Sequence, residues 1–190
     1  MLDDDHSLLA QALGGDEAAF SALYRRRQGQ IFRFAFHMTG NRSAAEDATQ
    51  ETFLALIERN GCPDASRGPL LPFLYGIARN KILRQFEKRR LEMDLDMASN
   101  NADSVAGALD ELARMESIIE LRRAIVCMPT PYREAIVLCD LEGATYEDAA
   151  IALSCPVGTI RSRLSRGRVL LAQKLNAART TNVRTARSIV

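Results

Sequence analysis

Arginine and serine side chains are concentrated in the segment from Cys155 to Arg168, CPVGTIRSRLSRGR. Guanidinium groups and hydroxyls bind phosphate oxygens and guanine edges, and arginine can do so through two parallel hydrogen bonds. If the segment is helical, an advance of roughly 100° per residue gathers Ile160 and Leu164 on one side. The opposite side and its edges then carry the candidate DNA-binding residues, which are Arg161, Ser162, Arg163, Ser165 and Arg166.

A basic face on one short helix is more often simply solvated, so the surrounding sequence decides between the two interpretations. Thr145 is placed to cap a helix from Tyr146 to Leu153, and Ser154-Cys155-Pro156 then turns the chain. A short helix, a tight turn and a basic second helix form the outline of a helix-turn-helix. From Val157 to the end the chain has bases and no acid. These features favour nucleic acid as the partner of the basic helix.

A second basic segment is the predicted helix from Pro72 to Arg90. Asn80 offers a donor and an acceptor on one short amide, which suits a base that has left the stack. Phe73, Tyr75 and Phe86 could supply surfaces for stacked bases, but aromatic residues at helical spacing are more often core, and we expect most of Phe73 and Phe86 to be buried. The bases that can hold a phosphate backbone are Arg79, Lys81, Arg84, Lys88, Arg89 and Arg90.

The helix expected to end near Arg59 carries an exposed stripe of acids around one apolar residue. Asp47, Glu51, Leu54 and Glu58 recur at the helical spacing of three and four. A merely solvated face would be expected to carry a polar residue at Leu54, so solvation alone does not explain the stripe. The alternative is an acidic face that balances nearby arginines.

The helical period dominates the whole chain, and no alternating strand pattern is convincing. Ser43 and Glu46 have the spacing of a capping box that starts the acidic helix. Asp16 and Gly40 are suited to begin and end a long helix before it. We therefore predict an all-α protein with two small helical domains, the second containing the helix-turn-helix. The expected helices span residues 7–13, 16–39, 43–59, 72–90, 109–127, 131–141 and 146–153, with the basic helix from 157 onward.

Charge is segregated along the chain, although the net charge is only +1. Residues 91–108 lie in an acidic, polar stretch without a strong apolar period, which predicts a flexible linker. The two domains are therefore expected at 1–90 and 109–176, with a frayed basic tail at 177–190. An acidic spacer would discourage the two basic domains from binding DNA without a partner.

The sequence argues against a metal centre, a disulfide framework and an enzyme active site. The 4 cysteines lie far apart without a CxxC pair, and the 2 histidines are His6 and His37. No nucleophile with a base, no partnered carboxylate pair and no phosphate-binding glycine loop is recognisable, and we expect no cofactor. The acidic start without a signal sequence, and the lack of an apolar run of spanning length, predict a cytoplasmic protein.

Two motifs in the N-terminal half, GNRSAAEDATQETFLALIE and PFLYGIARNKILRQFEKRR, precede the pair EGATYEDAA and CPVGTIRSRLSRGR. In this order they closely resemble the two domains of bacterial extracytoplasmic-function (ECF) sigma factors, in the sigma-70 family. The resemblance covers about residues 16–175. It implies a non-catalytic subunit of RNA polymerase that directs initiation from a specific set of promoters in response to a stress or signal.

The resemblance also implies a role for each surface. The helix-turn-helix would recognise the minus-thirty-five element. Core polymerase would be bound through the clamp helices of its largest subunit, with the flap of the second-largest subunit as a further partner, and the linker would thread toward the active-site and RNA-exit channels. An anti-sigma factor would hold the protein inactive, sometimes at the membrane. The residues implied for polymerase binding are Asp47, Gln50, Glu51 and Leu54. Those implied for the minus-ten element lie on and around the Ala78-Arg79-Asn80 triplet and are Phe73, Tyr75, Arg79, Asn80 and Arg84.

The chain departs from the family pattern at three positions. Many relatives carry Trp at Phe73, a basic residue at Gly76, and His or an aromatic residue at Ser165, so weaker stacking or a different base preference is expected. The competing interpretation is an autonomous helix-turn-helix regulator whose N-terminal domain senses a ligand or pairs with itself. The basic helix and Asn80 in that domain favour the sigma factor, because a sensor has no need of them.

Overall fold

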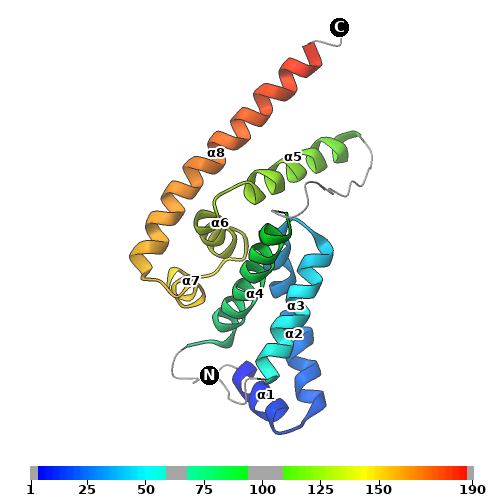
Figure 1. The fold of residues 1–190 in the computed structure, drawn as a ribbon, viewed down its shortest axis with the longest axis vertical. Helices are drawn as coiled ribbons and strands as arrows, with labels where there is room; N and C mark the ends of the chain where they lie inside the picture. Colours follow the sequence, from blue (N-terminus) through cyan, green and yellow to red (C-terminus); the bar gives the residue numbers. More distant parts are fainter. Residues whose placement is uncertain (1–3, 59–67, 94–108, 188–190) are drawn as a thin grey trace.

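The computed structural model describes residues 4–58, 68–93 and 109–187, and the regular elements within these ranges are helical. This confirms the predicted all-α class. The loop 59–67 and the part of the expected linker at 94–108 lie outside the described residues. The elements, shown in Figure 1, are α1 (Asp4–Leu13), α2 (Glu17–Thr39), α3 (Arg42–Glu58), α4 (Leu70–Met93), α5 (Leu109–Val126), α6 (Thr130–Ile136), the π-helical segment η2 (Val137–Leu141), α7 (Tyr146–Leu153) and α8 (Val157–Arg187).

Local sequence signals define three helix ends as predicted. The Asp16 carboxylate caps α2 by accepting hydrogen bonds from two backbone amides, at 2.9 and 3.1 Å. Gly40 ends the same helix in the left-handed region, with φ 68°, which glycine adopts without steric cost. The Thr145 hydroxyl caps α7 by accepting a hydrogen bond from the Asp148 amide at 3.0 Å. These ends fix where the chain reverses before α3 and where the helix-turn-helix begins.

The predicted capping box at the start of α3 is wrong. The helix begins at Arg42, and the side-chain oxygen of Asn41 caps it by accepting a hydrogen bond from the Ala44 amide at 2.9 Å. Glu46 pairs instead with Arg42 at 2.9 Å, and Ser43 is exposed. Asparagine caps a helix as well as serine does, and it comes earlier, directly after the turn that ends α2.

Two helices are longer than predicted. The first residues of the expected linker, 91–93, belong to the end of α4. The expected frayed tail is also wrong, because the backbone of α8 remains helical to Arg187. No glycine or proline follows Gly167, and the alanines and arginines of the tail are good helix formers, so nothing in the sequence stops the helix.

The described helices form two groups, α1 to α4 and α5 to α8, each with buried apolar residues. In the first group α2, α3 and α4 pack against one another, and α1 packs against α2. Its core includes Phe34, Phe53 and Leu74, which are at most 2% exposed. In the second group α8 packs on α6 and α7, with Ile160 and Leu164 buried between them.

The two groups are packed against each other, which the prediction of domains on a flexible linker did not include. Helix α4 lies beside α7 (Figure 1), and α2 contacts α5 and η2. A Cβ atom on Gly76 of α4 would lie 3.3 Å from the Ala152 carbonyl oxygen of α7, and one on Gly40 would lie 2.9 Å from Val126 of α5. The buried apolar side chains of both groups form one continuous cluster.

Protonation of His37 in α2 is expected to destabilise the fold near α5. Burial lowers the pKa of His37 below its ordinary value of 6.5, and the charges of Arg122 and Arg33 lower it further. Below pH 6.5 the unfolded chain therefore takes up a proton at His37 that the folded chain resists. The free energy of unfolding should decrease as the pH falls below 6.5, and His37 should not change it at pH values well above 6.5. Urea titrations on either side of pH 6.5 measure this dependence. The variant His37→Gln should reduce it, and an undiminished dependence would assign it to other groups.

Candidate nucleic-acid interface

Helix α8 presents its polar face to solvent and its apolar stripe to α6, as predicted. Ile160 and Leu164 are at most 1% exposed. A Cβ atom on Gly167 would lie 3.0 Å from Cγ1 of Ile136, so the missing side chain lets α8 pack closely on α6. Of the five predicted DNA-binding residues, four are exposed, namely Arg161, Ser162, Ser165 and Arg166. This face, here called the α8 surface, offers guanidinium and hydroxyl groups to a polyanion.

The four arginines of this segment are of two kinds. Arg161 and Arg166 belong to the α8 surface. Arg163 is only partly exposed, and its Nη1 lies 4.0 Å from Oε2 of Glu134. Arg168 forms two hydrogen bonds to Asp140, at 2.6 and 3.0 Å, and this pairing raises its already high pKa. The pair between Arg168 and Asp140 joins α8 to η2, and the sequence did not predict it because its members are distant along the chain.

The residues predicted for the minus-ten element fall into different environments on and near α4. Arg79, Asn80 and Arg84, here called the α4 surface, share the middle of the helix. Asn80 and Arg84 are exposed, but the Nε atom of Arg79 donates a hydrogen bond to Glu134 at 2.6 Å. Phe73 is half-buried against the core. Phe86, also half-buried, has the Arg133 guanidinium 5.8 Å from its ring centroid.

Tyr75, predicted as a possible stacking surface, is a core residue in this arrangement. It is 2% exposed, and its ring centroid lies 5.2 Å from that of Phe34. The hydroxyl is buried, with no hydrogen-bond partner within the described part of the chain. Burial raises the pKa of the phenol, and the nearby charge of Glu142 adds to this effect. Helical spacing could not separate Tyr75 from exposed aromatics, because Glu142 and Phe34 reach it only in the folded chain.

Glu134, a residue that no sequence pattern singles out, joins the two predicted DNA-binding helices. Its side chain is 1% exposed. The Glu134 carboxylate forms an ion pair with Nε of Arg79 in α4 at 2.6 Å and lies 4.0 Å from Nη1 of Arg163 in α8. A buried carboxylate is strongly disfavoured unless cations or donors pair with it. The two arginines are therefore held by one acid in the second helix group.

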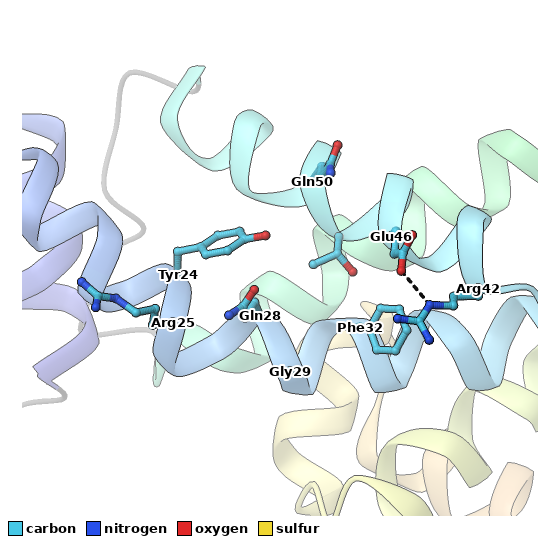
Figure 2. A pocket seen from close by; sticks show the side chains of 9 residues that line it. Tyr24, Arg25, Gln28, Gly29, Phe32, Arg42, Glu46 and Gln50 are labelled. Carbon is cyan, nitrogen blue, oxygen red and sulfur yellow. Dashed lines mark hydrogen bonds and ion pairs between the residues drawn. The ribbon is translucent and has the colours of Figure 1, made fainter.

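The acidic stripe on α3 is exposed as predicted, and a groove lies beside it. Asp47 and Gln50 are exposed and Leu54 is 60% exposed, whereas Glu51 pairs with Lys81 of α4 at 3.3 Å. The groove runs between α2 and α3 and has a volume of about 410 Å³ (Figure 2). Its lining includes aromatic rings, amides and one ion pair, from Tyr24, Gln28, Phe32, Arg42, Glu46 and Gln50. Gln50 makes the groove continuous with the acidic stripe.

Within the described ranges, no three His, Cys, Asp or Glu side chains gather closely enough to hold a metal ion. Burial raises the pKa of the Cys139 thiol to about 11, so this thiol stays protonated at neutral pH. Among the helices of the described segments, none combines the length and hydropathy needed to cross a bilayer.

Comparison with known proteins identifies the family. Two family profiles match the chain, sigma-70 region 2 over residues 23–92 and sigma-70 region 4 over residues 118–171. The ECF RNA polymerase sigma factor EcfG of Rhodopseudomonas palustris is 36% identical over 143 residues, which are 75% of this chain and 77% of the relative. SigC of Mycobacterium tuberculosis is 34% identical over 170 residues, 87% and 89% of the two chains. SigE of Mycolicibacterium smegmatis is 32% identical over 169 residues, but the match spans 85% of this chain and only 64% of that relative.

Solved structures agree with these matches across both helix groups. CnrH in complex with the cytosolic domain of CnrY is 26% identical, with a TM-score of 0.68 over 92% of this chain and 99% of that one. RpoE of Bartonella quintana, in complex with the anti-sigma factor NepR, is 26% identical, with a TM-score of 0.67 over 83% and 96% of the two chains. The chain belongs to the ECF RNA polymerase sigma factors of the sigma-70 family, as its motifs predicted.

Proposed function

We propose that this chain binds core RNA polymerase in the cytoplasm, recognises both elements of a specific set of promoters and helps to melt them. The observation that carries the proposal is that one chain holds two surfaces suited to DNA, one on α4 within the region 2 match and one on α8 within the region 4 match. Sigma factors are non-catalytic subunits, and binding energy offsets the cost of separating a few base pairs.

The α8 surface is assigned to the minus-thirty-five element. Arg166 and Ser162 stand opposite the buried stripe of Ile160 and are exposed, so they can reach base edges in a major groove. Arg161 flanks them, where phosphates run, and Ser165 lies beside Arg166. Arg163 completes the predicted set, but it must leave the neighbourhood of Glu134 to contact DNA.

The minus-ten element is assigned to α4. Asn80 and Arg84 are exposed, and an amide can pair with the edge of a base that has left the stack. Arg79 adds a phosphate contact when it is released from Glu134. Phe73 is partly accessible for stacking, whereas Tyr75 can contribute only where the covering helices withdraw.

The stripe on α3 is assigned to the binding of core polymerase. Leu54 is a large apolar side chain at 60% exposure, beside the exposed Asp47 and Gln50. An apolar anchor with a polar rim is typical of a protein interface. Glu51 belongs to the same stripe, and the groove beside Gln50 extends it. The clamp helices of the largest subunit are the proposed partner here, with the flap of the second-largest subunit for the second helix group.

An inhibitory protein partner is a further part of the proposal. Both solved relatives are complexes, of CnrH with the cytosolic domain of CnrY and of RpoE with the anti-sigma factor NepR. An anti-sigma factor that binds the two helix groups together would withhold both DNA-binding surfaces from promoters. Co-purification of the chain from its native host, followed by identification of stoichiometric partners, tests this part.

The proposal is tested with purified protein, core RNA polymerase and a library of genomic promoter fragments, with transcript 5′ ends mapped by sequencing. New start sites that require both the protein and core polymerase are the expected result. If no start depends on the protein while it binds specific duplex DNA alone, the autonomous regulator is the correct function.

Replacing Arg166 with alanine is expected to relax sequence preference at one upstream base. Loss of a base-reading arginine costs about 1–3 kcal/mol of binding free energy, whereas loss of a phosphate contact weakens all sequences alike. Arg161→Ala is the matched control, since both side chains are exposed on α8. Holoenzyme affinities for promoters that differ at single upstream positions measure the difference. Equal losses on every promoter would mean that Arg166 contacts only phosphate.

A further inference from the structure

The contact between the two helix groups covers part of the α4 surface. Gly76, Arg79 and Asn80 are related by spacings of three and four, so they share one face of α4. At Gly76 that face touches the backbone of α7, where a Cβ atom would come within 3.3 Å of the Ala152 carbonyl oxygen. A nucleic-acid strand following this face would meet α7 (Figure 1).

Glu134 engages arginine donors of the kind that a DNA phosphate would use. Its carboxylate is an oxyanion that accepts a hydrogen bond from Arg79 Nε at 2.6 Å and lies 4.0 Å from Arg163 Nη1. Arginine binds carboxylate and phosphate through the same donors, so Arg79 cannot hold Glu134 and the DNA backbone with the same atom. One acid thus competes with DNA for an arginine of each DNA-binding helix.

Further polar contacts join the two groups, and they are also provided by arginines. Arg133 of α6 donates to the Met38 carbonyl oxygen of α2 at 2.7 Å. Arg33 of α2 pairs at 3.0 Å with Glu142, whose side chain is 1% exposed. Buried ion pairs add specificity more than net stability, because desolvation cancels much of their attraction. An interface that depends on them is suited to open when a competing partner arrives.

We infer that Glu134 is a latch that holds the polymerase-free protein closed, with α7 over α4 and the α4 surface withheld from promoters. The inference rests on the proposed function, since it concerns the two DNA-binding surfaces assigned there. Gly76 is the second requirement, because a Cβ atom there would already make a tight contact with the backbone of α7, at 3.3 Å, and a longer side chain would need α7 to move. Promoter binding at α4 then requires separation of α7 from α4, after which Arg79 exchanges Glu134 for a phosphate.

Two variants of the full chain test the latch by different routes. Glu134→Gln keeps the size of the side chain and removes the charge that holds the arginines, and its control is Glu147→Gln, an exposed acid in the first turn of α7. Gly76→Leu places a side chain where α7 lies, without adding charge, and its control is Ala10→Leu at an exposed position of α1. Circular dichroism establishes that each variant remains helical.

The measurements are small-angle X-ray scattering of the free proteins and the affinity of a fluorescein-labelled forked DNA of mixed sequence, without polymerase. We expect the wild type and both controls to be compact. The two test variants should have a larger radius of gyration and bind the fork about tenfold or more tightly, since affinity scales with the population of the open state.

Three results would overturn the latch. One is a wild-type protein that is already extended in solution, and another is an unchanged radius and affinity in both test variants. The third is that Gly76→Leu opens the protein but Glu134→Gln does not, which would show that Glu134 does not hold the protein closed. If Glu134→Gln fails to fold, Gly76→Leu alone decides whether closure withholds DNA. These readouts need no polymerase, so failure of the polymerase-dependent start-site assay would leave their outcome intact.

Discussion

Leu54→Asp is expected to weaken binding to core polymerase at least about 30-fold while leaving the fold intact. Leu54 is 60% exposed on α3, so its replacement removes little buried contact within the chain. In the proposed complex the same position is desolvated, and an unpaired carboxylate there is strongly unfavourable. Truncation of a central interface residue costs 2 kcal/mol or more, which corresponds to a loss of at least about 30-fold in affinity.

The measurement is fluorescence anisotropy of labelled protein titrated with core polymerase, alongside urea denaturation of the free protein. Leu54→Met is the matched control, because it keeps an apolar side chain of similar volume and should bind within a few-fold of the wild type. If Leu54→Asp binds like the control, the stripe on α3 is a solvated acidic face and not a docking surface.

Unlike Leu54→Asp, which should leave the fold intact, Phe53→Ala should cause a large loss of folding stability. Phe53 is the neighbour of Leu54 but points into the core at 2% exposure, and its ring centroid lies 4.8 Å from that of Tyr24 in an edge-on contact. Deleting a buried phenylalanine side chain costs about 3–5 kcal/mol, from lost apolar burial and the cavity left behind. This is a large share of the stability of a domain of this size.

Urea denaturation at fixed pH measures the loss as a lower midpoint at an unchanged slope. Leu54→Ala is the control on the same helix, and its effect should remain within about 0.5 kcal/mol because the site is exposed. Similar losses for the two variants would show that Leu54 is packed in solution, which would also weaken its assignment to polymerase binding.

Local features of the chain were predictable because each depends on a few neighbouring residues. Asp16, Gly40 and Thr145 act on backbone groups within one helical turn, and their types alone select the cap or the left-handed end. The start of α3 was missed because Asn41 and Ser43 are both competent caps. Helix α8 extends further than predicted because the tail, although it lies beyond the family motifs, contains no helix-stopping residue after Gly167.

The sequence alone did not predict which aromatic side chains of α4 are buried. Helical spacing favours a core position for Phe73, Tyr75 and Phe86 alike, but the extent of burial depends on which neighbours reach each ring. Tyr75 meets Phe34 and the charge of Glu142 and is buried, whereas the other two are only half-buried. Periodicity reports the orientation of a side chain on its own helix, but burial is decided by the helices around it.

By itself the sequence determined the helices, the polar faces of α3 and α8, and the family, because these follow from short motifs and the helical repeat. Only the tertiary structure decided how the two helix groups meet. That contact depends on the missing side chain of Gly76 beside Ala152 and on the pairing of Arg79 with Glu134, 55 positions further along the chain. In each pair the sequence around one residue does not indicate the other, because the close approach and the buried ion pair exist only once both helices are in place.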